Sequence, residues 1–139
     1  MNEWSKKLIK ELGKENPDAL NILIIKYDSE GHISEDEVQE IIRKLLENNN
    51  SGIRALSFKF LQMITDEEYR VHIIKKALED SSWVMRADAV LFAMKYVDDE
   101  KTKAKVIEKG LNDRHYLVSS IVYENLSYME KLKSLKENG

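Results

Sequence analysis

Oxygen-bearing side chains gather in one short segment near the start of the chain, residues 26–37, with the sequence KYDSEGHISEDE. Asp28, Glu30 and Glu37 place carboxylates at intervals along it, and Gly31 stands where the backbone would have to turn sharply. Carboxylate oxygens are the ligands that Ca²⁺ prefers in proteins. The segment is therefore the sharpest candidate in the sequence for a metal site.

In length and pattern this segment resembles the calcium loop of an EF-hand, with Gly31 at its sixth position, Ile33 at its eighth and Glu37 at its twelfth. It departs from that loop at the first position, where Lys26 replaces the acidic ligand, and the sequence contains no second such loop. The other interpretation is a polar turn in which Ser34 and Glu37 form a capping box for the next helix. A degenerate calcium-binding module thus remains one alternative function, and we assign no metal ligands.

The other reactive residue types occur in isolation. His32, His72 and His115 have no partner at metal-ligand spacing, and no serine stands in a nucleophile elbow. The chain has no cysteine, which excludes thiolate nucleophiles and zinc–thiolate sites. Paired carboxylates such as Asp98 and Asp99 stand at an expected helix start, where capping accounts for them. The sequence therefore predicts no catalytic residues, no cofactor and no enzymatic activity.

Basic residues recur at a fixed place in the chain. Lys44, Lys76 and Lys109 each lie two residues before a leucine that anchors a repeated segment, and Arg43 and Lys75 directly precede the first two lysines. One cation per repeat on neighbouring helices would form a stripe that can contact an acidic peptide or phosphate groups. The other interpretation is the solvated side of amphipathic helices. We take these five residues as candidate partner-binding residues.

The anchoring leucines are Leu46, Leu78 and Leu111, which are 32 and 33 residues apart. Each follows a pair of branched apolar residues, and these pairs are Ile41-Ile42, Ile73-Ile74 and Val106-Ile107. After a polar turn, an apolar residue is followed four positions later by a second member of the same stripe; the pairs are Ile53 and Ser57, Met85 and Ala89, and Val118 and Val122. A spacing of four places two residues on one face of a helix. Each repeat is therefore predicted to be two helices joined by a turn, and such pairs bury their apolar faces by stacking.

This unit resembles the HEAT repeat, whose first helix carries an apolar residue and an arginine, then small residues, after a turn aspartate. The residues that match the arginine and the aspartate are Arg54, Arg86, Asp80 and Asp113. Asn48 stands in place of the first aspartate and Ser119 in place of the third arginine. The resemblance covers roughly residues 46–129. It implies a ladder in which Arg54 and Arg86 pair with the turn aspartates, and a concave face lined by the second helices.

The sequence predicts an all-α fold, a right-handed α-solenoid of about four stacked antiparallel helix pairs with an N-terminal capping helix. We expect one domain over residues 1–139, with the capping helix at 1–16 and repeats at 17–48, 49–80, 81–113 and 114–139. Expected helix starts include a capping box at Thr65–Glu68, an N-cap at Asp98 and another at Ser81 or Ser82.

Composition supports this fold and narrows the partners. One proline and five glycines among 139 residues are too few for the turns of an all-β fold. A formal net charge of −3 gives no strong field and argues against a dedicated nucleic-acid binder. The chain starts without a signal-like apolar run and has no apolar stretch near 18 residues, so we expect a cytoplasmic protein with no membrane contact.

These observations predict a non-catalytic scaffold or adaptor that binds a protein partner on the concave face of the repeats. The alternatives are nucleic-acid binding through the basic residues and the degenerate calcium module. The sequence leaves the identity of the partner and the oligomeric state open.

Overall fold

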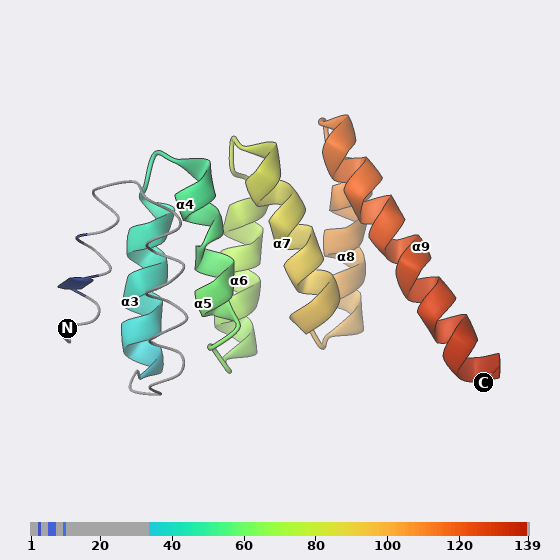
Figure 1. The fold of residues 1–139 in the computed structure, drawn as a ribbon, viewed down its shortest axis with the longest axis horizontal. Helices are drawn as coiled ribbons and strands as arrows, with labels where there is room; N and C mark the ends of the chain where they lie inside the picture. Colours follow the sequence, from blue (N-terminus) through green and yellow to red (C-terminus); the bar gives the residue numbers. More distant parts are fainter. Residues whose placement is uncertain (1–2, 4–5, 8–9, 11–33, 139) are drawn as a thin grey trace. The chain divides into compact units, whose positions relative to one another are not determined.

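The computed structural model describes residues 34–138 together with Glu3, Lys6, Lys7 and Lys10, and every regular element in that part of the chain is a helix (Figure 1). The all-α prediction is therefore confirmed for the described residues. The chain divides into two compact units, Met1–Asp66 and Glu67–Gly139, and this division falls inside the repeat predicted at 49–80. Most of the predicted capping helix at 1–16 and residues 17–33 of the first repeat lie outside the described residues.

In the first unit, α3 (Glu35–Leu46) packs against two short helices, α4 (Ser51–Ala55) and α5 (Ser57–Leu61). The Ser34 hydroxyl accepts a hydrogen bond from the Glu37 amide at 3.3 Å, which confirms Ser34 as the N-cap of α3. The core-facing residues of α3 are Val38, Ile41, Ile42 and Leu45. Residues 26–33 of the calcium-loop lookalike lie outside the described part of the chain.

The break between α4 and α5 corrects the prediction of one continuous helical stripe through Ile53 and Ser57. The Leu56 amide donates to the carbonyl of Ile53 at 3.1 Å, and the Lys59 amide donates to Leu56 at 3.0 Å. These hydrogen bonds span three residues, as in a 3₁₀ turn, so the helix tightens at Leu56. Beyond α5, the amide and hydroxyl of Thr65 donate to the Glu35 carboxylate of α3 at 2.7 and 2.6 Å. The hydroxyl predicted to cap the next helix is thus engaged with α3.

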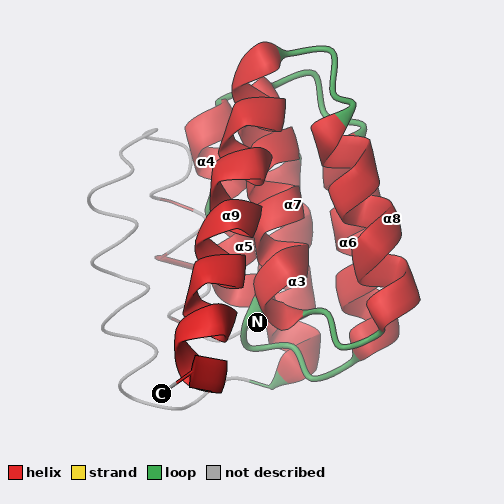
Figure 2. Ribbon diagram, turned by 90° about the vertical axis from the view of Figure 1, so that its right-hand side faces the viewer, coloured by secondary structure: helices red, strands yellow, loops and turns green. Residues whose placement is uncertain are grey.

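The second unit contains α6 (Glu67–Leu78), α7 (Trp83–Tyr96), α8 (Glu100–Leu111) and α9 (Tyr116–Asn138). Within this unit, Figure 2 shows α6 and α8 in one layer and α7 and α9 in the other. α7 is the central helix, because it packs against α6, α8 and α9. Its buried side chains include Met85, Ala89, Val90 and Ala93. Small residues on this face allow the neighbouring helices to approach closely.

Gly110 marks the closest approach in this unit. A Cβ atom added at this position of α8 would lie 2.8 Å from Cγ2 of Val90 on α7 and 3.0 Å from Cγ2 of Val122 on α9. Both distances are shorter than ordinary van der Waals contact. Glycine is therefore required here by packing.

The start of α8 also differs from the prediction. Asp99, and not Asp98, is the N-cap, and its carboxylate accepts hydrogen bonds from the Thr102 amide at 3.1 Å and the Thr102 hydroxyl at 2.5 Å. The Asp98 amide donates to Glu67 of α6 at 3.1 Å. This bond holds Asp98 in the connection before the helix, so the cap falls one residue later.

None of the helices in the described part of the chain combines the length and the apolar character needed to cross a membrane. The stacking of helix pairs into a right-handed solenoid and the number of pairs stay predictions.

Candidate functional site

The turns before three helices repeat one hydrogen bond. The side chains of Asn48, Asp80 and Asp113 each accept a hydrogen bond from the backbone amide two residues later, and all three distances are 2.8 Å. Asn48 replaces aspartate without loss of this bond, because its amide oxygen is also an acceptor. The repeated turn predicted from the leucine spacing is thus confirmed in these hydrogen bonds.

Two arginines close these turns in the same way. Arg54 Nη1 donates to the carbonyls five and six residues before it, at 2.9 Å each. Arg86 Nη1 donates to the equivalent pair of carbonyls at 3.2 and 2.9 Å. Ser119, at the third position, has no guanidinium, and its hydroxyl donates to the Tyr116 carbonyl at 3.0 Å. The arginines therefore have a structural role at their own turns.

Arg86 also reaches the next turn. Its Nε and Nη2 atoms donate to the two carboxylate oxygens of Asp113 at 2.8 and 3.1 Å, a bidentate pair between α7 and the connection from α8 to α9. Arg86 is only 3% exposed. Its hydrogen bonds hold the pKa of Asp113 below the ordinary value of that carboxyl group. The ladder contact between Arg86 and Asp113 is confirmed; that between Arg54 and Asp80 joins the two units and stays a prediction.

The candidate basic residues of the first unit have acidic neighbours on their own helix. Arg43 forms an ion pair with Glu40 and lies 4.0 Å from Glu47, and the Lys44 ammonium lies 3.9 Å from Glu47. The hydrogen bond between Arg43 and Glu40 lowers the pKa of Glu40 and raises that of Arg43. All four side chains lie on α3 and are wholly or partly exposed.

The candidate basic residues of the second unit lie on α6 and α8. Lys109 Nζ lies 2.6 Å from the Glu79 carboxylate at the end of α6, and this bond lowers the pKa of Glu79. Lys75 and Lys76 are exposed on α6. Alignment of these three lysines with Arg43 and Lys44 of the other unit stays a prediction.

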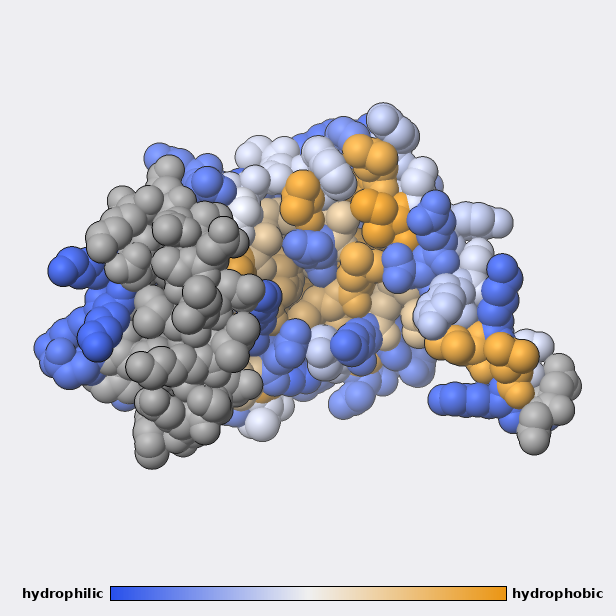
Figure 3. Space-filling model, viewed as in Figure 1, coloured by the Kyte–Doolittle hydropathy of each residue, from blue (hydrophilic) through white to orange (hydrophobic). Residues whose placement is uncertain are grey.

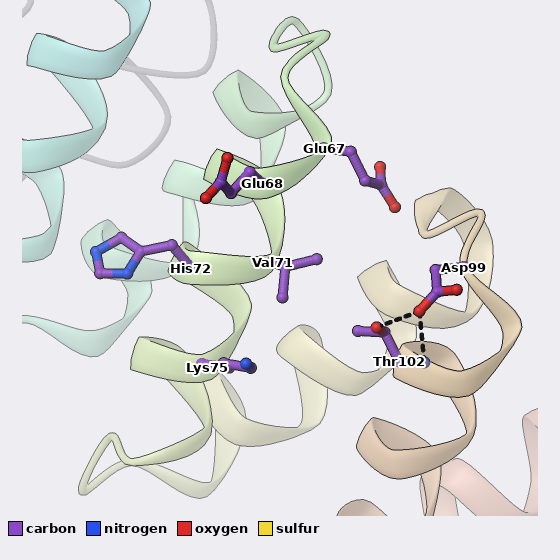
Figure 4. A pocket seen from close by; sticks show the side chains of 7 residues that line it. All are labelled: Glu67, Glu68, Val71, His72, Lys75, Asp99 and Thr102. Atoms are coloured by element: carbon purple, nitrogen blue, oxygen red, sulfur yellow. Dashed lines mark hydrogen bonds between the residues drawn. The ribbon is translucent and has the colours of Figure 1, made fainter.

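A groove of about 480 Å³ runs between α6 and α8 and brings one of these lysines together with acidic groups. Its lining residues are Glu67, Glu68, Val71, His72, Lys75, Asp99 and Thr102. Figure 4 shows Glu67 and Val71 extending toward α8, where Asp99 and Thr102 face them, whereas Glu68 and His72 point to the other side of α6. Glu67, Val71 and Lys75 are four residues apart and so form one stripe of α6.

The groove has a negative end and a positive end. Glu67 and Asp99 lie at the starts of α6 and α8, and Lys75 lies two turns along α6 from Glu67. Hydrogen bonds from the hydroxyl and amide of Thr102 hold the pKa of Asp99 below its ordinary value, which keeps this carboxylate charged. Val71 provides an apolar surface between the two ends. Such a surface suits a short peptide segment with a basic and an acidic side chain.

Sequence reasoning found only Lys75 among the groove residues. Glu67 and Asp99 were interpreted as capping residues, which describes their local role but not their position on a shared surface. The signal that could have found them is the repeat itself, because Glu67 and Asp99 are one period of 32 residues apart. Residues one period apart on neighbouring repeats lie side by side.

Two further features of the described residues bear on chemistry. No group of three or more potential metal ligands occurs among them. The rings of Trp83, His115 and Tyr116 form a stack, with centroids 5.1 and 5.2 Å apart, and His115 Nδ1 accepts a hydrogen bond from the Leu117 amide at 3.2 Å. His115 thus contributes to the start of α9.

Comparisons of the chain with protein-family models, with curated proteins and with solved structures give no match. The resemblance to HEAT repeats therefore rests on the residues of the turns and helices described above.

Proposed function

We propose that this protein is a non-catalytic scaffold of HEAT-like helix pairs that binds a protein partner along the face of its second helices. The observation that carries the proposal is the groove between α6 and α8, where Lys75 lies with carboxylates on an otherwise polar, exposed surface. Stacked helix pairs supply such grooves at a fixed spacing without requiring any reaction chemistry. A right-handed solenoid with this face concave is part of the proposal.

The charges of the groove favour a peptide segment over a polyanion. Glu67 and Asp99 attract a basic side chain, Val71 suits an apolar one, and Lys75 attracts an acidic one. A phosphate backbone would meet both carboxylates at the same time as the lysine. Three of the five candidate basic residues, Arg43, Lys44 and Lys109, also lie within 4.0 Å of a glutamate. Nucleic acid would have to compete with these carboxylates for each cation, which makes it the weaker alternative.

The test is partner capture from a lysate with the purified chain and matched charge variants. Lys75→Glu reverses the charge of the positive end of the groove, and Lys44/Lys76/Lys109→Glu reverses the repeated lysines. Lys133→Glu is the control, because Lys133 is exposed on α9 and lies outside the groove. We expect a protein partner that is retained by the control and lost by Lys75→Glu.

Two results would contradict the proposal. Equal recovery of the partner by Lys75→Glu and the control would remove the groove as the binding surface. Recovery of nucleic acid that dissociates steeply with added salt would instead support the alternative function.

A further inference from the structure

The two halves of α9 differ in what their apolar side chains contact. The first half buries Val118 and Val122 in the unit, where α9 packs on α7 and α8. In the second half, Tyr128 and Leu135 are 61% and 70% exposed. Figure 1 shows this half of α9 diverging from α8, and Figure 3 shows hydrophobic side chains gathered on it among hydrophilic ones.

The exposed side chains have the spacing of a coiled-coil seam. Residues separated alternately by three and four positions are Val118, Ile121, Asn125, Tyr128, Leu132 and Leu135. Val118 is buried in its own unit, and the other five are partly or largely exposed. The exposed seam from Ile121 to Leu135 is about 21 Å long at 1.5 Å per residue. Asn125 places one amide in it, and a polar residue at such a position specifies register and partner number.

The charges beside the seam are self-complementary. Glu124 and Lys131 lie on the same side of it and are seven residues apart. In two antiparallel copies of α9 related by a two-fold axis, Glu124 of each copy lies beside Lys131 of the other. In the same register Ile121 faces Leu132 of the second copy. Apolar contact and charge pairing therefore agree in a single arrangement.

Other arrangements of two copies place like charges together. Sliding the antiparallel pair by one heptad brings Lys131 beside Lys131 of the second copy, and sliding it the other way brings Glu124 beside Glu124. A parallel pair in register brings Lys131 beside Lys136 of the second copy. Like charges at these positions disfavour the wrong arrangement. The flanking residues of α9 thus select one pairing, and that pairing is with itself.

We propose that the exposed seam of α9 binds a second copy of this chain and forms an antiparallel helix pair with two-fold symmetry. This surface lies on α9, outside the groove between α6 and α8, so the inference does not rest on the proposed function. The dimer presents two grooves to a partner.

Sedimentation equilibrium on the full chain tests the contact. We expect the apparent mass to rise with concentration from 16.2 kDa toward twice that value. Leu132→Asp combined with Leu135→Asp should abolish the rise and preserve the helical circular dichroism, because both leucines are exposed. Tyr123→Asp is the matched control, because Tyr123 is exposed on α9 but lies off the seam. A monomer at every concentration, or a dimer that survives the double substitution, overturns the proposal.

A mixing experiment tests the antiparallel register. Glu124→Lys gives a chain with two lysines beside the seam, and Lys131→Glu gives one with two glutamates. Each variant should lose self-association at low salt, whereas their equimolar mixture should recover the dimer mass. A mixture that associates no better than its components, or an assembly larger than a dimer, contradicts the antiparallel pair.

Discussion

Two ion pairs of the second unit join residues about a repeat apart, and they differ mainly in burial. Arg86 and Asp113 are 2.8 Å apart with side chains 4% and 11% exposed. Lys109 and Glu79 are 2.6 Å apart with side chains 56% and 73% exposed. The buried pair holds two turns together in a place where water cannot replace either partner. The exposed pair leaves both groups accessible to solvent and to a binding partner, so burial and not distance separates the structural pair from the candidate binding surface.

Removal of one partner from the buried pair should give the largest effect. Asp113→Ala leaves the Arg86 guanidinium without its charge partner and removes the acceptor for the His115 amide. We expect the free energy of unfolding to fall by about 3–5 kcal/mol, as when a buried pair is broken on one side. Urea titration followed by circular dichroism measures it. Glu79→Ala is the control in the exposed pair, and a loss as large as that of Asp113→Ala would refute the distinction.

The packing around the buried pair gives the next largest effect. Gly110→Ala forces a methyl group to within 2.8 Å of Val90 and 3.0 Å of Val122. Overpacking of this kind costs about 1–3 kcal/mol, although alanine is the better helix former. The reverse change at an exposed position of the same helix, Ala104→Gly, should cost about 1 kcal/mol through helix propensity alone. If Gly110→Ala is instead more stable than the wild type in thermal unfolding, α8 does not approach α7 and α9 this closely.

The pH dependence of stability should separate the two pairs in the same way. The pKa of Asp113 is lower in the folded chain than in the unfolded chain, because Arg86 donates to its charged form. Its contribution to stability is therefore complete above the unfolded pKa and is lost as the pH falls through the folded pKa. Asp113→Asn should lack this part of the acid dependence. The difference between the two unfolding curves over acid pH measures it, and parallel curves would contradict a lowered pKa in the fold.

The sequence was informative about the turns because their chemistry is local. Asn48, Asp80 and Asp113 bond to amides two residues away, so their spacing alone predicts the repeated turn. The helix break at Leu56 could not be predicted, because no glycine or proline stands there and the tightening is a property of the folded backbone. The start of α8 at Asp99 depends on Glu67, which is distant in sequence.

The candidate site was predicted only in part for the same reason. Lys75 was identified from the repeated basic positions, but its position in a groove depends on how α6 lies beside α8. Lys109 was identified too, whereas its bond to Glu79 joins residues 30 positions apart. Side-chain pairing across helices follows from packing, and a pattern within one helix does not contain it.

Lys109→Gln should produce the smallest effect on stability. The exposed ammonium and its glutamate are both well hydrated in the unfolded chain and nearly so in the folded one, so their pairing gains little. We expect the melting temperature to match that of the wild type within the error of calorimetry, and salt to leave the comparison unchanged. Partner capture by the same variant then reports on binding without a change in fold. A clear drop in melting temperature would show that this pair, like Arg86 and Asp113, holds the helices together.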